Sequence, residues 1–157
     1  MDAVSSSDEF TRLVLSVFRL NGLLIEAGDR MTAPVGQTSA RWQVMGVIDH
    51  GPRTVASVAR TMGLRRQSVQ RTADLLVADG VAAYSENPDD KRAKLLDLTP
   101  AGRRSLRRIE RTQRKWAREL GAEIGLERLR AADRTLTQAI ALLEAGAGGS
   151  ERTFRVE

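Results

Sequence analysis

The fold of this chain is indicated first by residues 54–71, which read TVASVARTMGLRRQSVQR. Four apolar side chains in the first half recur at helical spacing: Val55, Val58, Ala59 and Met62. This spacing predicts a helix over 54–62, capped by Thr54 and ended by Gly63, and a second helix follows over 65–79. Two short helices joined by a glycine-containing turn are typical of a helix-turn-helix, whose second helix enters the major groove of DNA.

The outward side of the second predicted helix is rich in arginine and glutamine. Arginine can form two hydrogen bonds to guanine, glutamine can do so with adenine, and serine can bind a phosphate. An ordinary solvated helix would mix in acids, yet the first acid after Arg65 is Asp74. We therefore expect contacts with DNA bases or phosphates from Arg65, Arg66, Gln67, Ser68, Gln70 and Arg71.

The hydrophobic period changes to that of β-strands after Gly80. Residues 81–86 and 93–98 can alternate between two faces, and the charged turn between them predicts a β-hairpin with a basic tip. An arginine on a thin hairpin can enter a narrow minor groove, and the Asp90 carboxylate could orient the Arg92 guanidinium. A solvated charged turn explains the tip equally well, but its place after a helix-turn-helix favours a DNA-binding wing with contacts from Asp90, Lys91 and Arg92.

Periodic apolar residues predict further helices on both sides of this module, over 7–30, 39–50, 100–120 and 125–145. The fold class is therefore mainly α with a small β-hairpin wing. The helix over 100–120 carries many arginines, which we interpret as solvated and locally paired; contact with DNA or with acidic lipid is the alternative.

Composition excludes several other classes of function. The chain has 25 basic and 20 acidic residues, which suits a polyanionic partner, although a GC-rich genome would also favour arginine. It has no cysteine, and His50 is its only histidine, so we expect no disulfide, no metal site and no cofactor. We find no catalytic motif, no membrane span and no signal peptide, and therefore expect a cytoplasmic protein that is not an enzyme.

The chain resembles the MarR family of transcription regulators. The resemblance rests on residues 54–64, on residues 68–71, and on Asp90-x-Arg92 followed by residues 98–102, which read LTPAG. It is close over 51–102 and implies a winged helix-turn-helix with a helical dimerisation region. The implied parts are an N-terminal helix contributing to dimerisation (1–37), the DNA-binding module (38–98) and C-terminal dimerisation helices (99–146). The remaining tail (147–157) is Gly-rich and polar, and we expect it to be disordered.

The resemblance also assigns roles to individual residues. It places Arg66, Gln67, Gln70 and Arg71 in the major groove, Ser68 on a phosphate and Arg92 in the minor groove. It also implies that Asp90 holds Arg92 in position. Two positions depart from the family pattern: Gln70 stands where threonine is frequent, and Tyr84 stands where a basic residue is common. The resemblance further implies an effector cleft between the dimerisation helices and the DNA-binding lobe, where Arg41 and Trp42 could lie.

We therefore expect a sequence-specific regulator, most simply a repressor, that binds a pseudo-palindromic operator in double-stranded DNA as a homodimer and is released by a small-molecule effector. A non-specific architectural DNA-binding protein is the main alternative. A small-molecule sensor that acts through a protein partner is a further one.

Overall fold

A computed structural model describes residues 5–148 of the chain. These residues form two compact units, one up to Gln113 and one from Arg114 onward, and each is described by itself. The elements in chain order are α1 (Ser6–Thr32), η1 (Ala33–Val35), α2 (Ser39–Ile48), β1 (Arg53–Thr54), α3 (Val55–Met62), α4 (Arg66–Ala78), β2 (Ala82–Ser85), β3 (Leu95–Leu98), α5 (Pro100–Ile124) and α6 (Leu126–Gly148).

Short-range capping sets the helix boundaries around the helix-turn-helix. The hydroxyls of Thr38 and Thr54 accept hydrogen bonds from backbone N–H groups in the first turns of α2 and α3. Gly63 ends α3 in the left-handed region at φ 63°, where a residue without Cβ is not strained. The Thr99 hydroxyl accepts from the Gly102 N–H at 3.1 Å and begins α5 in the same way. The predicted helix-turn-helix is therefore confirmed.

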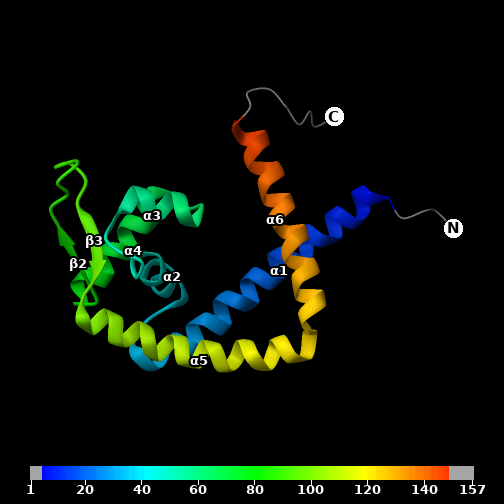
Figure 1. The fold of residues 1–157 in the computed structure, drawn as a ribbon, viewed down its shortest axis with the longest axis horizontal. Coiled ribbons are helices and arrows are strands. Elements are labelled where there is room, and N and C mark those ends of the chain that lie inside the picture. The colour runs from blue at the N-terminus through cyan, green and yellow to red at the C-terminus, as the bar shows by residue number, and fades with distance from the viewer. Residues whose placement is uncertain (1–4, 149–157) are drawn as a thin grey trace. The chain divides into compact units, whose positions relative to one another are not determined.

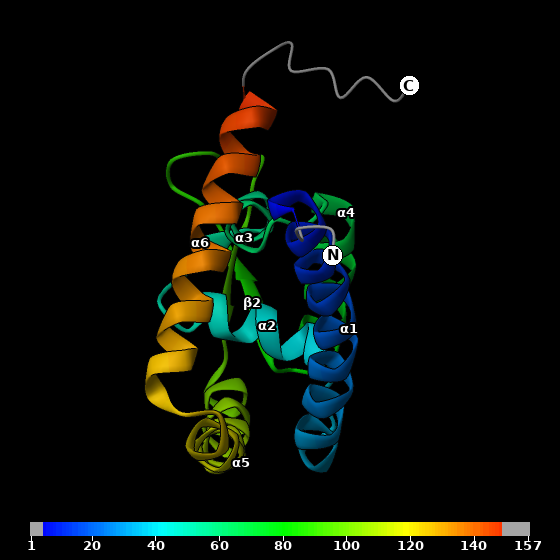
Figure 2. The same cartoon turned by 90° about the vertical axis from the view of Figure 1, so that its right-hand side faces the viewer.

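The core of the first unit lies between the helix-turn-helix, the wing and the start of α5. Figure 1 shows α2, α3 and α4 grouped beside the β2–β3 hairpin. The same grouping is seen from another side in Figure 2. The side chains with under 2 % exposure that join these elements are Val44, Met45, Ile48, Val58, Val69, Ala73, Leu76, Leu96 and Leu106. Leu75 of α4 lies outside this core, and 44 % of it is exposed.

The wing contains one more strand than the sequence predicts. The predicted hairpin is β2 and β3, paired antiparallel with Ala82 opposite Leu98. On its other side, β3 pairs with β1 through Arg53 opposite Leu96, which gives the sheet order β1-β3-β2. A two-residue strand is too short to show an alternating pattern, so only its pairing partner reveals it.

The first turn of α5 packs tightly on the wing. A Cβ placed on Gly102 would lie 2.0 Å from the backbone oxygen of Val81, just before β2. Thr99 adds a hydrogen bond from its hydroxyl to the Gly80 oxygen at 2.7 Å. The start of α5 is therefore part of the same packed unit as the wing.

The helices outside the DNA-binding module differ from it in their exposure. Several large apolar side chains of α1 face solvent, among them Leu15, Phe18 and Leu23. In the second unit, α6 continues through Gly148, beyond the end predicted near 145, and it also exposes apolar side chains. Of the tail predicted over 147–157, residues 149–157 lie outside the described part of the chain. No described helix combines the length and the apolar character that a membrane crossing needs.

Candidate nucleic-acid interface

The helix α4 presents its predicted contact residues on the side opposite its core contacts. Val69, Ala73 and Leu76 are buried, and the opposite face borders an open depression. The residues that line this depression are Arg66, Gln67, Gln70, Arg71, Asp74 and Leu75. The spacing of three and four residues thus places core side chains and candidate DNA contacts on separate faces of one helix.

Three arginines of this region have no partner within the described residues. Arg65, which precedes α4 in extended conformation, and Arg66 and Arg71 on the helix are exposed. Their guanidinium groups form no hydrogen bond or ion pair with any described residue. Ser68 and Gln67 are also exposed. Five of the six predicted contact residues are therefore free to meet a polyanion.

Gln70 differs from its neighbours because its side-chain amide is already engaged. Its Nε2 donates to Asp74 Oδ1 at 2.9 Å and to the Tyr84 hydroxyl at 2.8 Å. The Tyr84 hydroxyl in turn donates to the same carboxylate oxygen at 2.8 Å. In sequence, Gln70 and Tyr84 are two separate departures from the family pattern, whereas the structure joins them through Asp74.

Tyr84 stands on β2, so this triad ties the wing to α4. Partial burial raises the pKa of Tyr84 to about 12, and the hydrogen bond to Asp74 and its negative charge act in the same direction. Tyr84 therefore stays a neutral hydroxyl at physiological pH and can both donate and accept. The sequence holds a signal for this contact: Asp74 is the acid on the exposed face of α4, four residues after Gln70.

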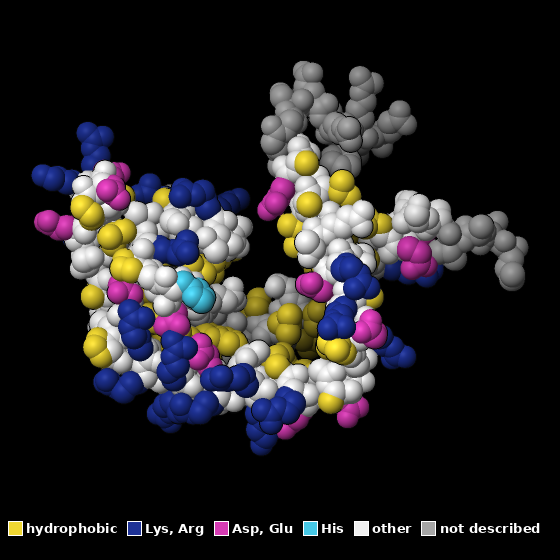
Figure 3. Space-filling model, in the orientation of Figure 1, with side chains coloured by type: hydrophobic (Ala, Val, Ile, Leu, Met, Phe, Trp, Pro, Cys, Tyr) yellow, Lys and Arg dark blue, Asp and Glu magenta, His cyan; other side chains and the backbone are white. Residues whose placement is uncertain are grey.

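The tip of the wing is shaped by its acids in a way the sequence did not predict. The Asp90 carboxylate accepts from the backbone N–H of Arg92 at 2.9 Å, and the Asn87 side chain accepts from the N–H of Asp89 at 3.0 Å. Asp90 therefore orders the turn through the backbone, and the expected contact with the Arg92 guanidinium is absent among the described residues. Lys91 and Arg92 are exposed without side-chain partners, and Figure 3 shows basic side chains projecting from this tip.

The two residues expected in an effector cleft both make contacts within the first unit. The Arg41 guanidinium forms an ion pair with Asp79 at 2.7 Å, which links α2 to the end of α4. Trp42 is half-buried against the core. A small cavity of about 200 Å³ lies elsewhere in the first unit, between the end of α1, η1 and α5. Its lining residues are Met31, Pro34, Val35, Arg108, Ile109, Arg111 and Thr112.

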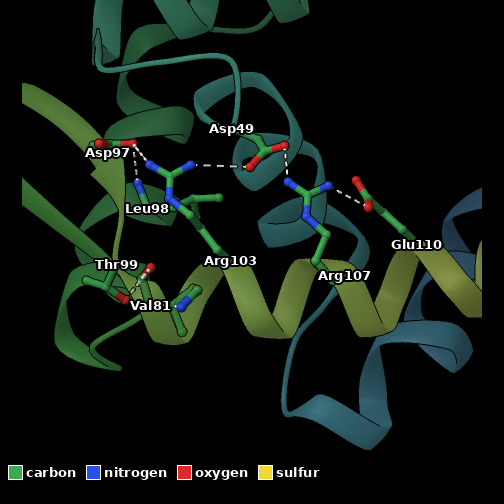
Figure 4. Close-up of polar contacts among 9 residues, drawn as sticks. Asp49, Val81, Asp97, Leu98, Thr99, Arg103, Arg107 and Glu110 are labelled. Atoms are coloured by element: carbon green, nitrogen blue, oxygen red, sulfur yellow. Dashed lines mark hydrogen bonds and ion pairs between the residues drawn. The ribbon is translucent and has the colours of Figure 1, made fainter.

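Two arginines on α5 are held by acids from other elements and from α5 itself (Figure 4). Arg103 lies 2.9 Å from Asp97 on β3 and 3.4 Å from Asp49 at the end of α2. Arg107 pairs with the other oxygen of Asp49 and, at 2.6 Å, with Glu110. Hydrogen bonds to Asp49 and Glu110 raise the pKa of Arg107 above its ordinary value. The sequence predicted only local pairing here, so Asp49 and Asp97 were missed as partners.

Comparisons with known proteins agree with this geometry. Residues 36–93 match the sequence model of the MarR family. An uncharacterized protein of Mycobacterium tuberculosis is 47% identical over 103 residues, which cover 66% of this chain and 72% of that protein. The transcriptional regulator MosR of M. tuberculosis, solved in complex with DNA, is 25% identical with a TM-score of 0.69, covering 83% of this chain and 96% of that one.

A second structure solved with DNA shows the same likeness. The transcriptional repressor CouR, bound to a 23-mer DNA duplex, is 25% identical with a TM-score of 0.69 over 90% of this chain and 99% of its own. The family match covers α2 to the wing, and the structural likeness extends over the long helices on both sides. This chain belongs to the MarR family of winged helix-turn-helix, DNA-binding transcription regulators.

Proposed function

We propose that this regulator is a sequence-specific repressor that binds a pseudo-palindromic operator as a homodimer. The observation that carries the proposal is the set of unpaired guanidinium groups at the start of α4 and on its exposed face, those of Arg65, Arg66 and Arg71. A guanidinium without an internal partner can form two hydrogen bonds to guanine or to a phosphate at full strength. The solved structures of MosR and CouR with DNA support the choice of ligand.

The proposed contacts divide into base contacts and phosphate contacts. Arg66, Gln67 and Arg71 would face base edges in the major groove, and Ser68 would bind a phosphate. On the wing, Arg92 would enter the minor groove, beside Lys91 near the backbone. Asp90 would act indirectly, since its carboxylate holds the backbone N–H of Arg92.

The homodimer is supported by apolar surface on the helices outside the DNA-binding module. On α1, 63 % of Leu15, 70 % of Phe18 and 52 % of Leu23 are exposed. A monomer rarely exposes so many large apolar side chains on one helix, and a second copy would cover them. A two-fold dimer presents two α4 helices, which predicts half-sites whose centres lie about one helical turn apart.

Selection of bound sequences from random double-stranded DNA tests the proposal, together with light scattering of the free protein. We expect an enriched pseudo-palindrome and the mass of a dimer. Competition between the enriched site and random DNA distinguishes the alternative. A specificity ratio near one would mean a non-specific architectural protein, and a stable monomer at micromolar concentration would contradict the dimer.

We further propose that a small organic carboxylate weakens DNA binding from the cavity beside α5. Arg108 and Arg111 reach this cavity without a partner among the described residues, and Met31, Val35 and Ile109 form its apolar wall. Two cations beside apolar surface suit an aromatic or branched carboxylate, and about 200 Å³ limits its size.

Thermal melting and DNA release with a panel of small carboxylates test the effector site. We expect a subset to raise the melting temperature and release DNA, and the combined Arg108→Ala and Arg111→Ala substitutions to remove both effects. If carboxylates act equally on this variant, they bind elsewhere. That result would contradict the cavity beside α5 and favour a site near Arg41 and Trp42.

A further inference from the structure

The side-chain amide of Gln70 is oriented by its two partners. Asp74 is acceptor-only when ionised, so the Gln70 atom that lies 2.9 Å from Oδ1 must be the NH₂ nitrogen. The Tyr84 hydroxyl gives its proton to the same Oδ1 and keeps a lone pair, which also requires a donor from Gln70. Hydrogen-bond chemistry thus excludes the flipped amide, in which the carbonyl oxygen would meet the carboxylate.

Of the two ends of the Gln70 amide, the nitrogen has two hydrogen-bond partners among the described residues and the carbonyl oxygen has none. The three sides of the triad measure 2.8, 2.8 and 2.9 Å, so Nε2 occupies one corner of a nearly equilateral triangle. Seen from Nε2, the two acceptors lie closer together in direction than the two N–H bonds of a planar NH₂ group do. Both hydrogen bonds are therefore bent. Oε1 has no partner among the described residues, and Gln70 borders the same open depression as Arg66, Gln67 and Arg71.

We propose that Tyr84 and Asp74 determine base specificity by presenting Gln70 to the major groove as a hydrogen-bond acceptor alone. A free glutamine pairs with adenine through a donor to N7 and an acceptor from N6–H₂. Gln70, with its nitrogen held, accepts from the amino group of adenine or of cytosine. It therefore favours these two bases over guanine and thymine, which present carbonyl oxygens. This inference rests on the proposed function, because it requires sequence-specific binding.

Gln67 provides an internal control on the same helix. Its side chain is exposed and has no hydrogen-bond partner among the described residues, so both ends of its amide are available. The base pair that meets Gln67 should favour adenine alone, whether or not Tyr84 is intact. Tyr84→Phe should therefore change the preference at the position read by Gln70 and leave the position read by Gln67 unchanged, which assigns the change to the triad.

The test is selection from random DNA with the wild type, Gln70→Ala, Tyr84→Phe and the double variant. The position that loses its preference in Gln70→Ala is the one read by Gln70, and adenine and cytosine should both be enriched there in the wild type. Tyr84→Phe frees one N–H, which can then bind adenine N7. We expect the ratio of adenine to cytosine to rise about fivefold, which corresponds to the net free energy of one neutral hydrogen bond. In the Gln70→Ala background, Tyr84→Phe should change nothing.

Asp74→Ala is the second variant, because it releases the same nitrogen without altering the tyrosine ring; it should also favour adenine. An equal loss of affinity on all sequences with unchanged preference would make the triad a structural brace and overturn the inference. The inference would also be overturned if the wild type rejected cytosine at the position read by Gln70, or if no position responded to Gln70→Ala. If the wild type enriches no sequence at all, the proposed function itself fails, which is a different result.

Discussion

Two arginine-rich helices, α4 and α5, use the same side chain for different purposes. On α4, Arg66 and Arg71 have no partner among the described residues. On α5, Arg103 and Arg107 are held by acids that come from α2, β3 and α5 itself. Both helices look alike in the sequence, as amphipathic segments with a basic face.

From this difference we infer that pairing, and not arginine content, distinguishes the candidate DNA-binding surface. A guanidinium that already meets two carboxylates loses those contacts if it turns to a phosphate, whereas an unpaired one loses only water. The paired arginines join the end of α2, the wing and α5, so they stabilise the fold. We therefore expect substitution of the paired arginines to affect folding, and substitution of the unpaired ones to affect DNA binding.

The largest effect is expected where α5 packs on the wing. Gly102→Ala places a Cβ 2.0 Å from the Val81 oxygen, and backbone cannot move aside as a flexible side chain can. We expect the free energy of unfolding to fall by about 3 kcal/mol, measured by denaturant titration at fixed protein concentration. Gly46→Ala is the control, since nothing lies within 4 Å of a Cβ in that helix, and it should be neutral or stabilising. Equal losses in both variants would contradict the packing.

A smaller effect, on binding alone, is expected from an unpaired arginine of α4. Arg71→Ala should weaken operator binding by about 1–3 kcal/mol without changing the melting temperature, because no internal contact is lost. Fluorescence anisotropy on the operator and on random DNA separates a base contact from a phosphate contact. Arg104→Ala, at an exposed and unpaired position of α5, is the matched control and should leave operator affinity nearly unchanged.

The paired arginines of α5 can be freed by an isosteric change in their shared acid. Asp49→Asn should lower the free energy of unfolding by about 1 kcal/mol, a modest value because Arg103 and Arg107 are 42 % and 46 % exposed. Glu9→Gln removes a fully exposed pair with Arg12 and should cost less than about 0.5 kcal/mol. If Asp49→Asn instead raised operator affinity strongly, arginine content alone would explain DNA binding, and the contrast between the helices would be lost.

A titration of the wild-type protein at high pH reports the link between α4 and the wing. Tyr84 is the only tyrosine, so tyrosinate absorbance reports it alone, and we expect a midpoint near 12 in the folded protein against about 10 in denaturant. The folded protein binds this proton more tightly, so its contribution to stability is present below pH 10 and is lost as pH rises from 10 to 12. Asp74→Asn should lower the midpoint, and a wild-type midpoint near 10 would contradict the triad.

Local patterns in the sequence were sufficient for the helix-turn-helix, the hairpin and the family. Thr54, Gly63 and Thr99 act on backbone groups only a few residues away, so their effect can be predicted without knowing the rest of the fold. The exposed positions of Arg66 and Arg71 follow from helical spacing in the same way. The sequence by itself therefore determined the main helices, the hairpin and which face of α4 is polar.

Only the tertiary structure decided which polar side chains remain available. Gln70 meets Tyr84 across 14 positions, and Asp49 meets Arg103 and Arg107 across 54 and 58. The strand β1 also exists only because β3 lies beside it. Such contacts depend on how the chain folds back on itself, and no spacing rule reaches that far along the sequence. For this reason the polar, exposed face of α4 could be predicted, while the hydrogen-bonding state of Gln70 could not.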